Sequence, residues 1–332
     1  MRAHVVCVAA LAFLAAGCGR GAALPSPSPP TFAAAAREGF DPDRLRSAER
    51  RLARDPQLTS VLVMRHGRLV LERYYHGMSR DRPWSMYSMT KSVISALVGI
   101  ALGDHRLRGV DQRVVEVFPD ELLTDADPRI RMVTLRDLLT MSAGYRNENT
   151  PYETDDWVRA LLNRPLVTPP GKVFSYDDGS AHLLSAVLTK VTGVPAAVFA
   201  RRELFRPLGV EPGRWNTDGQ GRSLGSGGLF LRPRDMLRLG QLYLQDGRWH
   251  GRRIVPRAWV RASTRRQIAI PGGYAYGYLW WINTGPHGGF LAQGRDGQVI
   301  EVFPRLSLVM VMTGVGEDPR PLTRALLGAI SG

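Results

Sequence analysis

The sequence predicts an α/β (α+β) fold in which one antiparallel sheet is built from both chain ends and is flanked by helices. Two observations predict it. Apolar stretches typical of strands occur near both ends of the chain, whereas residues from about 110 to 225 have the apolar spacing of helices and predict a helical subdomain. The 332 residues are 44% hydrophobic and 22% charged, which is the composition of a globular protein. A cleft between the sheet and the helical part is the expected ligand site.

The N-terminus predicts export and anchoring. Arg2 and His4 precede an apolar stretch and then the small residues 15–17, so residues 1–17 are predicted to be a signal peptide. Cys18 follows directly, and the arrangement resembles the lipobox of bacterial lipoproteins, although Ala15 stands where that pattern usually has leucine. We therefore expect an extracytoplasmic protein that is lipid-anchored to a bacterial membrane. A plain signal peptide cut elsewhere, or an uncleaved anchor, is the alternative.

Residues 18–36 are predicted to be the lipidated cysteine and a linker, because the proline-rich stretch 25–30 favours extended polyproline II. The folded domain is predicted over residues 37–332. Its first elements are a helix over 40–54 and a β-hairpin, with strands 58–64 and 69–75 joined at His66-Gly67. Residues 88–102 are apolar nearly all round and predict a buried helix.

The remaining elements follow from the same patterns. Helices are predicted in the middle of the chain and strands near its end, with a last turn at Pro304-Arg305 and a closing helix over 321–330. The predicted helices are 136–141, 154–162, 180–192, 196–204, 234–245 and 256–263, and the predicted strands are 274–282, 290–293, 299–303 and 306–313.

Charge and cysteine content exclude several classes of function. The net charge is +14, but no run of basic residues is interleaved with aromatics and no DNA-binding spacing occurs, so we expect no nucleic acid partner. The two cysteines, Cys7 and Cys18, precede the domain, which therefore has no disulfide and no catalytic thiol. No cluster of His, Asp and Glu has metal-ligand spacing, so we expect neither a metal nor another cofactor.

A serine and a lysine one helical turn apart carry the predicted chemistry. Ser88 and Lys91 stand at positions i and i+3 at the start of the buried helix, so their side chains share one face. A serine hydroxyl needs a base within hydrogen-bond reach, and burial biases a lysine towards the neutral amine that can accept a proton. The positive end of the helix favours an oxyanion there. The alternative is a capping serine beside a solvated lysine.

These residues resemble the first motif, Ser-x-x-Lys, of the penicillin-recognising serine hydrolases, and the whole pattern is most similar to the class C β-lactamase and 6-aminohexanoate-dimer hydrolase-like branch. The resemblance implies a β-lactamase/transpeptidase-like fold and a serine hydrolase that forms an acyl-enzyme on Ser88. The substrate would be a small-molecule or peptide amide or ester. The resemblance extends over residues 84–93, 134–145, 170–193, 227–249 and 294–314.

The second family motif, Tyr-x-Asn, is Tyr176-Asp177-Asp178 here. The resemblance implies that Tyr176 shares the proton of Ser88 with Lys91 and that Asp178 contacts the substrate. An ionised Asp178 cannot donate a hydrogen bond as the usual asparagine amide does, which puts any substrate held by that amide in doubt.

The third motif matches best at Arg295-Asp296-Gly297, which the resemblance makes substrate-binding residues. It also implies an oxyanion hole formed by the N–H groups of Ser88 and Gln298. His287-Gly288-Gly289 is a rival match. Carboxylates at positions 178 and 296 would together disfavour anionic substrates, because like charges repel strongly in a cleft of low dielectric.

Several aromatic residues and one histidine have weaker assignments. Tyr145 is taken as a substrate-binding residue, and Trp157 and Trp281 as further candidates to line the cleft. His182 lies on an apolar helix and is expected to be a buried structural histidine.

Two alternative functions remain open from the sequence. Residues 221–225 fit G-x-S-x-G, which would make Ser223 the nucleophile of an α/β-hydrolase esterase if a strand preceded it and a helix followed. The second alternative is a penicillin-type receptor or cell-wall-binding lipoprotein that is acylated without turnover, which the unusual acids Asp178 and Asp296 keep open.

Overall fold

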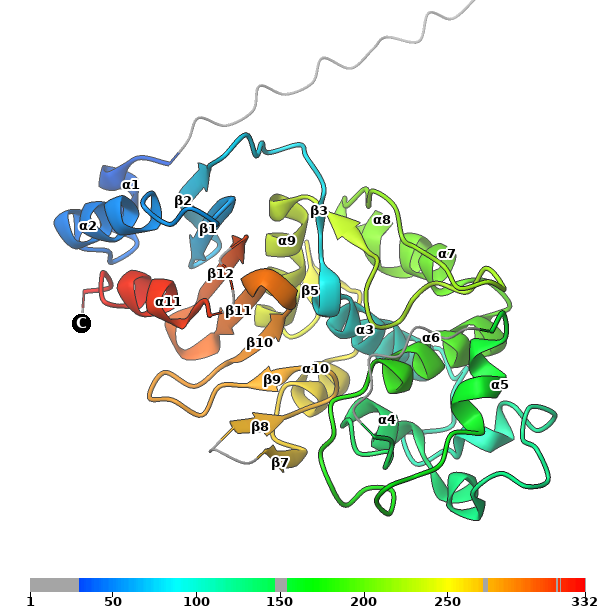
Figure 1. Cartoon of the computed structure of the whole chain (residues 1–332). Coiled ribbons are helices and arrows are strands. Elements are labelled where there is room, and N and C mark those ends of the chain that lie inside the picture. Colours follow the sequence, from blue (N-terminus) through cyan, green and yellow to red (C-terminus); the bar gives the residue numbers. More distant parts are fainter. Residues whose placement is uncertain (1–29, 147–153, 271–273, 315, 317, 332) are drawn as a thin grey trace, which may run out of the picture.

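The computed structural model describes residues 30–146, 154–270, 274–314, 316 and 318–331. The predicted signal peptide and Cys18 lie outside these residues. The predicted linker, by contrast, is already helical near its end, because Thr31 caps helix α1 (Phe32–Arg37). Figure 1 shows α1 beside α2 (Pro42–Leu52), whose first turn is fixed by the Asp41 cap and by Pro42 at its start.

The predicted sheet from both chain ends is confirmed. The described residues form an eight-stranded antiparallel sheet in the order β2-β1-β12-β11-β10-β9-β8-β7. Strand β1 from the N-terminal hairpin pairs with β12 near the C-terminus, with Val61 opposite Met312. The strands are β1 (Ser60–Arg65), β2 (Arg68–Tyr74), β7 (Ile268–Ile270), β8 (Tyr274–Tyr276), β9 (Trp281–Ile282), β10 (Phe290–Gln293), β11 (Val299–Phe303) and β12 (Leu308–Thr313).

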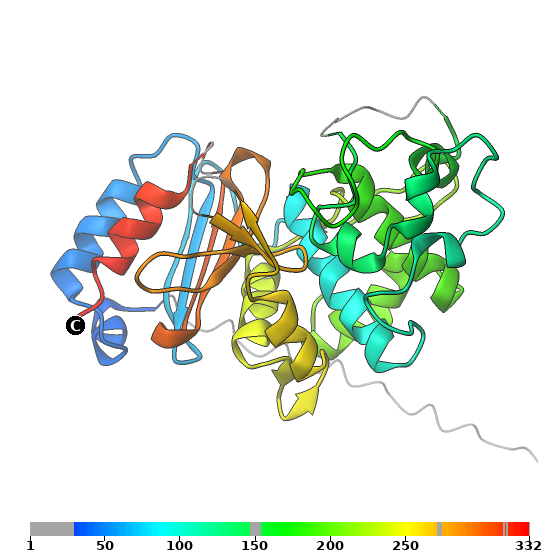
Figure 2. The same cartoon turned by 90° about the horizontal axis from the view of Figure 1, so that it is seen from below.

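Helices cover both faces of this sheet. Successive side chains of a strand point to opposite faces, so Met310 and Met312 join the core under α1, α2 and α11 (Arg320–Leu327), while Val309 and Val311 join the core on the other side. On that second side α9 (Pro233–Leu244) packs on β12 and β11. Figure 2 shows the three layers, with the blue and red helices on one face and the yellow helices on the other. Burial on both faces explains the continuous apolar sequence of β12.

The helical part lies beyond α9 and α10 (Arg257–Ser263), on the side away from the first layer (Figure 2). Its centre is α3 (Thr90–Gly103), which is apolar and buried along most of its length and packs against α6 (Asp178–Thr192). Helices α4 (Leu135–Leu139), α5 (Trp157–Leu162) and α7 (Ala196–Ala200) pack around α6. A π-helical turn connects α7 to α8 (Arg206–Leu208). Two small two-stranded sheets complete the fold: β3 (Trp84–Ser85) with β4 (Phe230–Leu231), and β5 (Arg248–Trp249) with β6 (Arg252–Arg253).

Two of the differences from the prediction have a clear structural cause. The predicted strand 274–282 is broken into β8 and β9, because the chain turns tightly between them: Gly277 N–H donates to Trp280 O at 2.8 Å, and Leu279 has a φ of +58°. Helix α6 begins two residues earlier than predicted, since the Asp177 side chain accepts the N–H of Ser180 and caps it. The earlier start puts Asp178 into the first helical turn.

Among the described residues no single helix is long and apolar enough to cross a membrane; the bent pair Asp178–Thr192 and Ala196–Leu208 meets that test by length and composition only. The same residues contain no group of three His, Cys, Asp or Glu side chains arranged to hold a metal ion.

Candidate active site

Ser88 lies in a strained turn where the chain enters α3. A 3-10 turn (Tyr87–Met89) connects β3 to this helix, and Tyr87 has a φ of +43° in the left-handed region that non-glycine residues rarely adopt. Backbone strain of this kind costs about 1–3 kcal/mol and persists only where the surrounding structure holds it. Here the N–H of Met86 donates to Leu229 O at 2.8 Å, which fixes the turn to the neighbouring strand pair. The turn displays Ser88 at the N-terminal end of the helix.

Lys91 is buried, with only 1% of its surface exposed, and its ammonium is surrounded by acceptors. Nζ donates to Ser88 Oγ at 3.0 Å, to Asp178 Oδ1 at 2.6 Å and to Ser226 O at 3.1 Å. All three protons of the ammonium therefore have a partner. The Tyr176 ring lies beside the same nitrogen, with 4.7 Å between Nζ and the ring centroid.

These contacts correct the prediction that Lys91 is biased towards the neutral amine. Burial acts to lower the pKa of Lys91, but the opposing effects of Tyr176 and the Asp178 carboxylate are together larger, and the pKa is raised above its ordinary value. The resting site therefore holds a Lys91–Asp178 ion pair. Sequence reasoning counted burial and missed the charged partner, because Asp178 reaches Lys91 only through the early start of α6.

The same ion pair changes the prediction about anionic substrates. Asp178 is neutralised by Lys91, so it adds little negative charge to the cleft. Asp296 remains, and it is exposed beside Arg295 at the far wall. Burial first, and then the Asp296 charge and a hydrogen bond to it, raise the pKa of the Tyr87 hydroxyl. Of the two acids, Asp296 is the one that lines the cavity described below.

A cavity of about 650 Å³ opens over Ser88. Tyr176 lines it and stacks on Trp281, with 5.8 Å between ring centroids and 20° between planes. The opposite wall is the turn after β10, which the sequence picked out as the third motif. The lining residues are Ser88, Tyr176, Trp281, Gln293, Gly294, Arg295, Asp296 and Gly297. The structure thus brings the three predicted motifs to one cavity.

Gly294 lets that turn approach the serine closely. A Cβ atom built on Gly294 would lie 2.7 Å from Met86 O and 3.3 Å from the backbone nitrogen of Ser88. Any side chain there would displace the strained turn. Gly294 and Gln293 were not singled out as site residues from the sequence. A glycine directly before the third motif was the sequence signal that could have pointed to a close backbone approach there.

Some predicted residues lie elsewhere. Gln298 is fully buried and does not line the cavity; its side-chain oxygen accepts the N–H groups of Trp84 (3.0 Å) and Gly314 (2.8 Å). Tyr145 is 1% exposed and packs under Arg164, with 4.7 Å from the guanidinium to the ring centroid. The rival motif residue His287 lines a different cavity, beside Glu301. The predicted substrate-binding role of Tyr145 has no support in this geometry.

The alternative nucleophile Ser223 is also ruled out by its surroundings. Its surface is fully buried, and its hydroxyl accepts the N–H of Ala197 at 2.9 Å. It lies in a loop with only an isolated bridge to Thr217, without a strand before it and a helix after it. The α/β-hydrolase alternative is therefore wrong.

Comparisons with known proteins agree with this geometry. The sequence model of the family described as Beta-lactamase matches residues 57–329. A 6-aminohexanoate-dimer hydrolase from Paenarthrobacter ureafaciens is 24% identical over 307 residues, which cover 83% of this chain and 77% of that protein.

Solved structures share the fold. A penicillin-binding protein homologue from Caulobacter crescentus superposes with a TM-score of 0.71 at 16% identity, covering 87% of this chain and 97% of that one. A β-lactamase/D-alanine carboxypeptidase from Pseudomonas syringae gives 0.71 at 16% identity, covering 87% and 99%. The predicted family resemblance and fold class are confirmed.

Proposed function

This chain belongs to the beta-lactamase family and is a serine hydrolase, and from that premise we propose that it cleaves amide or ester bonds through an acyl-enzyme on Ser88. The observation that carries the proposal is the 3.0 Å contact between Lys91 Nζ and Ser88 Oγ at the floor of the cavity. A small-molecule or peptide substrate would enter between Trp281 and the turn 293–297.

In the proposed first step, the substrate carbonyl carbon is attacked by Ser88 Oγ while the hydroxyl proton leaves to the Lys91–Tyr176 pair. The resting ammonium cannot accept a proton, so the pair must first have lost one, either from Nζ or from the phenol. The pair is then either a neutral amine beside a phenol or an ammonium beside a phenolate. These two states have the same total charge and differ only in the position of one proton. Tyr176 then passes the proton to the leaving amine or alcohol, which departs as the carbonyl re-forms.

The developing oxyanion needs donors that are fixed in advance. The N–H of Ser88 lies at the positive end of α3 and supplies one. We propose that the second comes from the turn 293–297 rather than from Gln298, because residues of this turn line the cavity beside Ser88. Water then attacks the acyl carbon and gives its proton to the same pair, which returns a proton to Ser88 Oγ as the acyl–oxygen bond breaks and the acid product leaves.

A burst experiment tests the proposed pathway. Rapid mixing with a p-nitrophenyl ester is expected to release about one p-nitrophenolate per chain before the steady rate, which is the kinetic signature of an accumulating acyl-enzyme. A burst without a following steady rate would support the non-turnover receptor instead. Turnover through a non-covalent path would contradict the proposal, and so would a burst that survives Ser88→Ala.

Replacing Asp178 with asparagine is expected to shift the pH dependence. The Asp178 carboxylate helps to raise the pKa of Lys91, so its removal lowers that pKa. The deprotonated Lys91–Tyr176 pair then exists at lower pH, and the rising limb of kcat/KM against pH moves to lower pH. Asp296→Asn is the matched control, since Asp296 is not in contact with Lys91 and should leave the limb in place. An unchanged limb in Asp178→Asn would show that Lys91 does not take part in the titration.

We also propose that Cys18 carries a lipid anchor that holds the domain outside the cytoplasm. The support is the sequence alone: small residues precede Cys18 and a proline-rich stretch follows it. Cys18→Ser is expected to abolish incorporation of labelled palmitate and to move the hydrolase activity from the membrane pellet to the soluble fraction. Cys7→Ser, within the predicted signal peptide, is the matched control. Labelled palmitate on the Cys18→Ser chain would contradict the anchor.

A further inference from the structure

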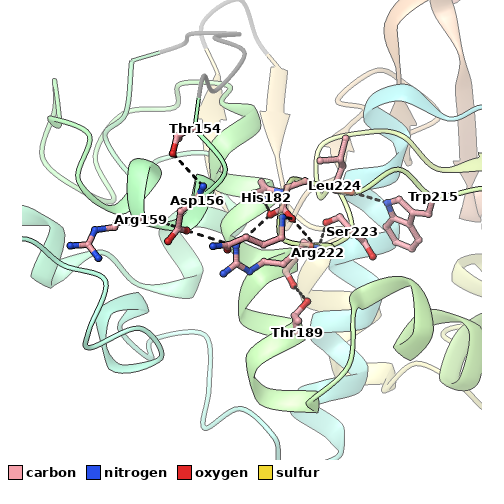
Figure 3. Close-up of polar contacts among 12 residues, drawn as sticks. Thr154, Asp156, Arg159, His182, Thr189, Trp215, Arg222, Ser223 and Leu224 are labelled. Carbon is pink, nitrogen blue, oxygen red and sulfur yellow. Dashed lines mark hydrogen bonds and ion pairs between the residues drawn. The ribbon is translucent and has the colours of Figure 1, made fainter.

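The loop 218–226 lies against α6 and is held there at three places. His182 Nε2 and Asp218 Oδ2 are 3.1 Å apart, and Ser185 Oγ donates to Ser223 O at 2.6 Å. At Gly225 the backbones nearly touch, since a Cβ atom built there would lie 2.0 Å from Ala181 O. Figure 3 shows His182 of α6 facing the loop that carries Arg222, Ser223 and Leu224.

The end of this loop contacts the catalytic lysine. Ser226, directly after Gly225, accepts from Lys91 Nζ at 3.1 Å through its carbonyl. The N-terminal turn of α6 supplies Asp178, which accepts from the same nitrogen at 2.6 Å. Helix α6 thus positions two of the three acceptors around the ammonium, one directly and one through the loop.

The His182–Asp218 contact is buried and charged. His182 is 2% exposed, and the Asp218 side chain is 0% exposed. Burial acts to raise the pKa of Asp218, but hydrogen bonds from His182 and from the Arg222 backbone, with the nearby charges, lower it below its usual range. Asp218 is therefore a carboxylate, and it accepts a hydrogen bond from the Nε2–H group of His182. It also accepts the backbone N–H groups of Gln220 (3.0 Å) and Arg222 (2.8 Å), which shape the loop.

The other side of the His182 ring makes no competing hydrogen bond. Nδ1 is buried and has no hydrogen-bond partner among the described residues, and the ring packs edge-on against Trp157 with 5.1 Å between centroids. The orientation of the imidazole is thus set by Asp218. Two buried polar side chains of α6, His182 and Ser185, therefore both make their polar contacts with the loop.

We propose that His182 and Asp218 are positioning residues for Lys91: they hold the loop 218–226 against α6 so that the Ser226 carbonyl stays on the lysine ammonium. Neither residue touches the substrate cavity. The effect on catalysis rests on the proposed role of Lys91, whereas the effect on the Lys91 environment does not.

The chain offers a direct probe, because Lys91, Lys172 and Lys190 are its only lysines. Protein labelled with ¹³C and ¹⁵N in lysine gives three resolvable side-chain signals, and the Lys91 signal reports its own surroundings. In His182→Leu we expect the Lys91 signal to move and its titration to shift to lower pH, since an acceptor of the ammonium is withdrawn. His182→Gln places a donor near the Nε2 position and is expected to restore the wild-type signal.

Activity gives the second readout. His182→Leu is expected to lower kcat for a p-nitrophenyl ester about tenfold or more, with KM little changed. The reason is that a displaced Lys91 takes the proton of Ser88 less readily, which affects the chemical step and not substrate binding. His182→Gln should recover most of kcat. Thr189→Val is the matched control, since the Thr189 hydroxyl bonds only the carbonyl of Ser185 within α6 and the substitution should alter neither the Lys91 signal nor kcat.

The outcomes separate this inference from the proposed function. A folded His182→Leu protein with an unchanged Lys91 signal would overturn the inference, whatever its activity. If that variant does not fold, Ser185→Ala removes the middle contact of the loop more gently, and the Lys91 signal should move in the same direction by a smaller amount; an unmoved signal there would also overturn it. A moved signal with full activity would leave the positioning intact and contradict the catalytic role of Lys91.

Discussion

Ser88→Ala is expected to lower kcat/KM for a p-nitrophenyl ester by a factor on the order of 10⁴ or more, while KM and the melting temperature change little. Loss of Oγ removes the atom that forms the acyl bond, and the described lining of the cavity holds no second serine, threonine or cysteine. The hydroxyl accepts one hydrogen bond from Lys91, and its loss leaves the Asp178 and Ser226 contacts of the ammonium in place. Initial rates over a range of substrate concentrations check this.

Ser223→Ala is the matched control for that result. Ser223 is fully buried, and its hydroxyl accepts the N–H of Ala197, so the substitution should cost about 1 kcal/mol of stability and leave kcat/KM nearly unchanged. Equal losses in the two variants would mean that Ser88 acts only through the fold. A Ser88→Ala protein that retains most of its activity would remove the proposed nucleophile.

Lys91→Met is expected to lower kcat/KM by about 10²–10⁴-fold, the range that general acid–base catalysis contributes. Methionine keeps the unbranched side chain as far as the Cε position and removes Nζ with its three hydrogen bonds. It also leaves Asp178 without its cation, so we expect a loss of stability together with the loss of rate. The loss of stability is reduced because the Asp178 side chain is 39% exposed and solvent reaches the carboxylate. Thermal melting and steady-state kinetics measure the two effects separately.

A second substitution distinguishes the loss of the Asp178 counter-ion from the loss of the proton-accepting group in the Lys91→Met variant. Lys91→Met combined with Asp178→Asn removes both members of the ion pair, and we expect stability to recover while activity does not. Lys172→Met and Lys190→Met, at the two exposed lysines, are the matched controls and should change neither. If the double variant regained activity, Lys91 would be needed only to neutralise Asp178.

The architecture could be read from the sequence because its pattern is local. Short continuous apolar runs predicted β1 and β12, and the all-round apolar surface of residues 88–102 predicted the buried helix α3. Ser88 and Lys91 are one turn apart on that element, so their contact follows from helix geometry. The break between β8 and β9 was missed, because it depends on a left-handed Leu279 that no residue pattern marks.

The charge state of the site could not be read in this way. Lys91 meets Asp178 and Ser226 from positions far along the chain, and only the folded structure puts their oxygens within 3.1 Å of Nζ. Tyr145 is a related case: it is the last residue of a family stretch, yet its side chain is buried in the core. Contacts between segments that are distant in the sequence determine both the charge state of Lys91 and the burial of Tyr145. The spacing of residues within one segment does not predict such contacts.

Covalent labelling tests the central claim, an acyl-enzyme on Ser88, most directly. The protein is mixed with p-nitrophenyl butyrate, quenched in acid during turnover, digested with trypsin and analysed by mass spectrometry. We predict one butyryl group per chain on the peptide of residues 81–91, and we expect fragmentation to assign it to Ser88 rather than to Ser85 or Thr90. In a parallel sample that is moved to buffer without substrate before the quench, we expect this group to be lost. A butyryl group at any other residue during turnover, or turnover with no covalent adduct at all, would contradict the account.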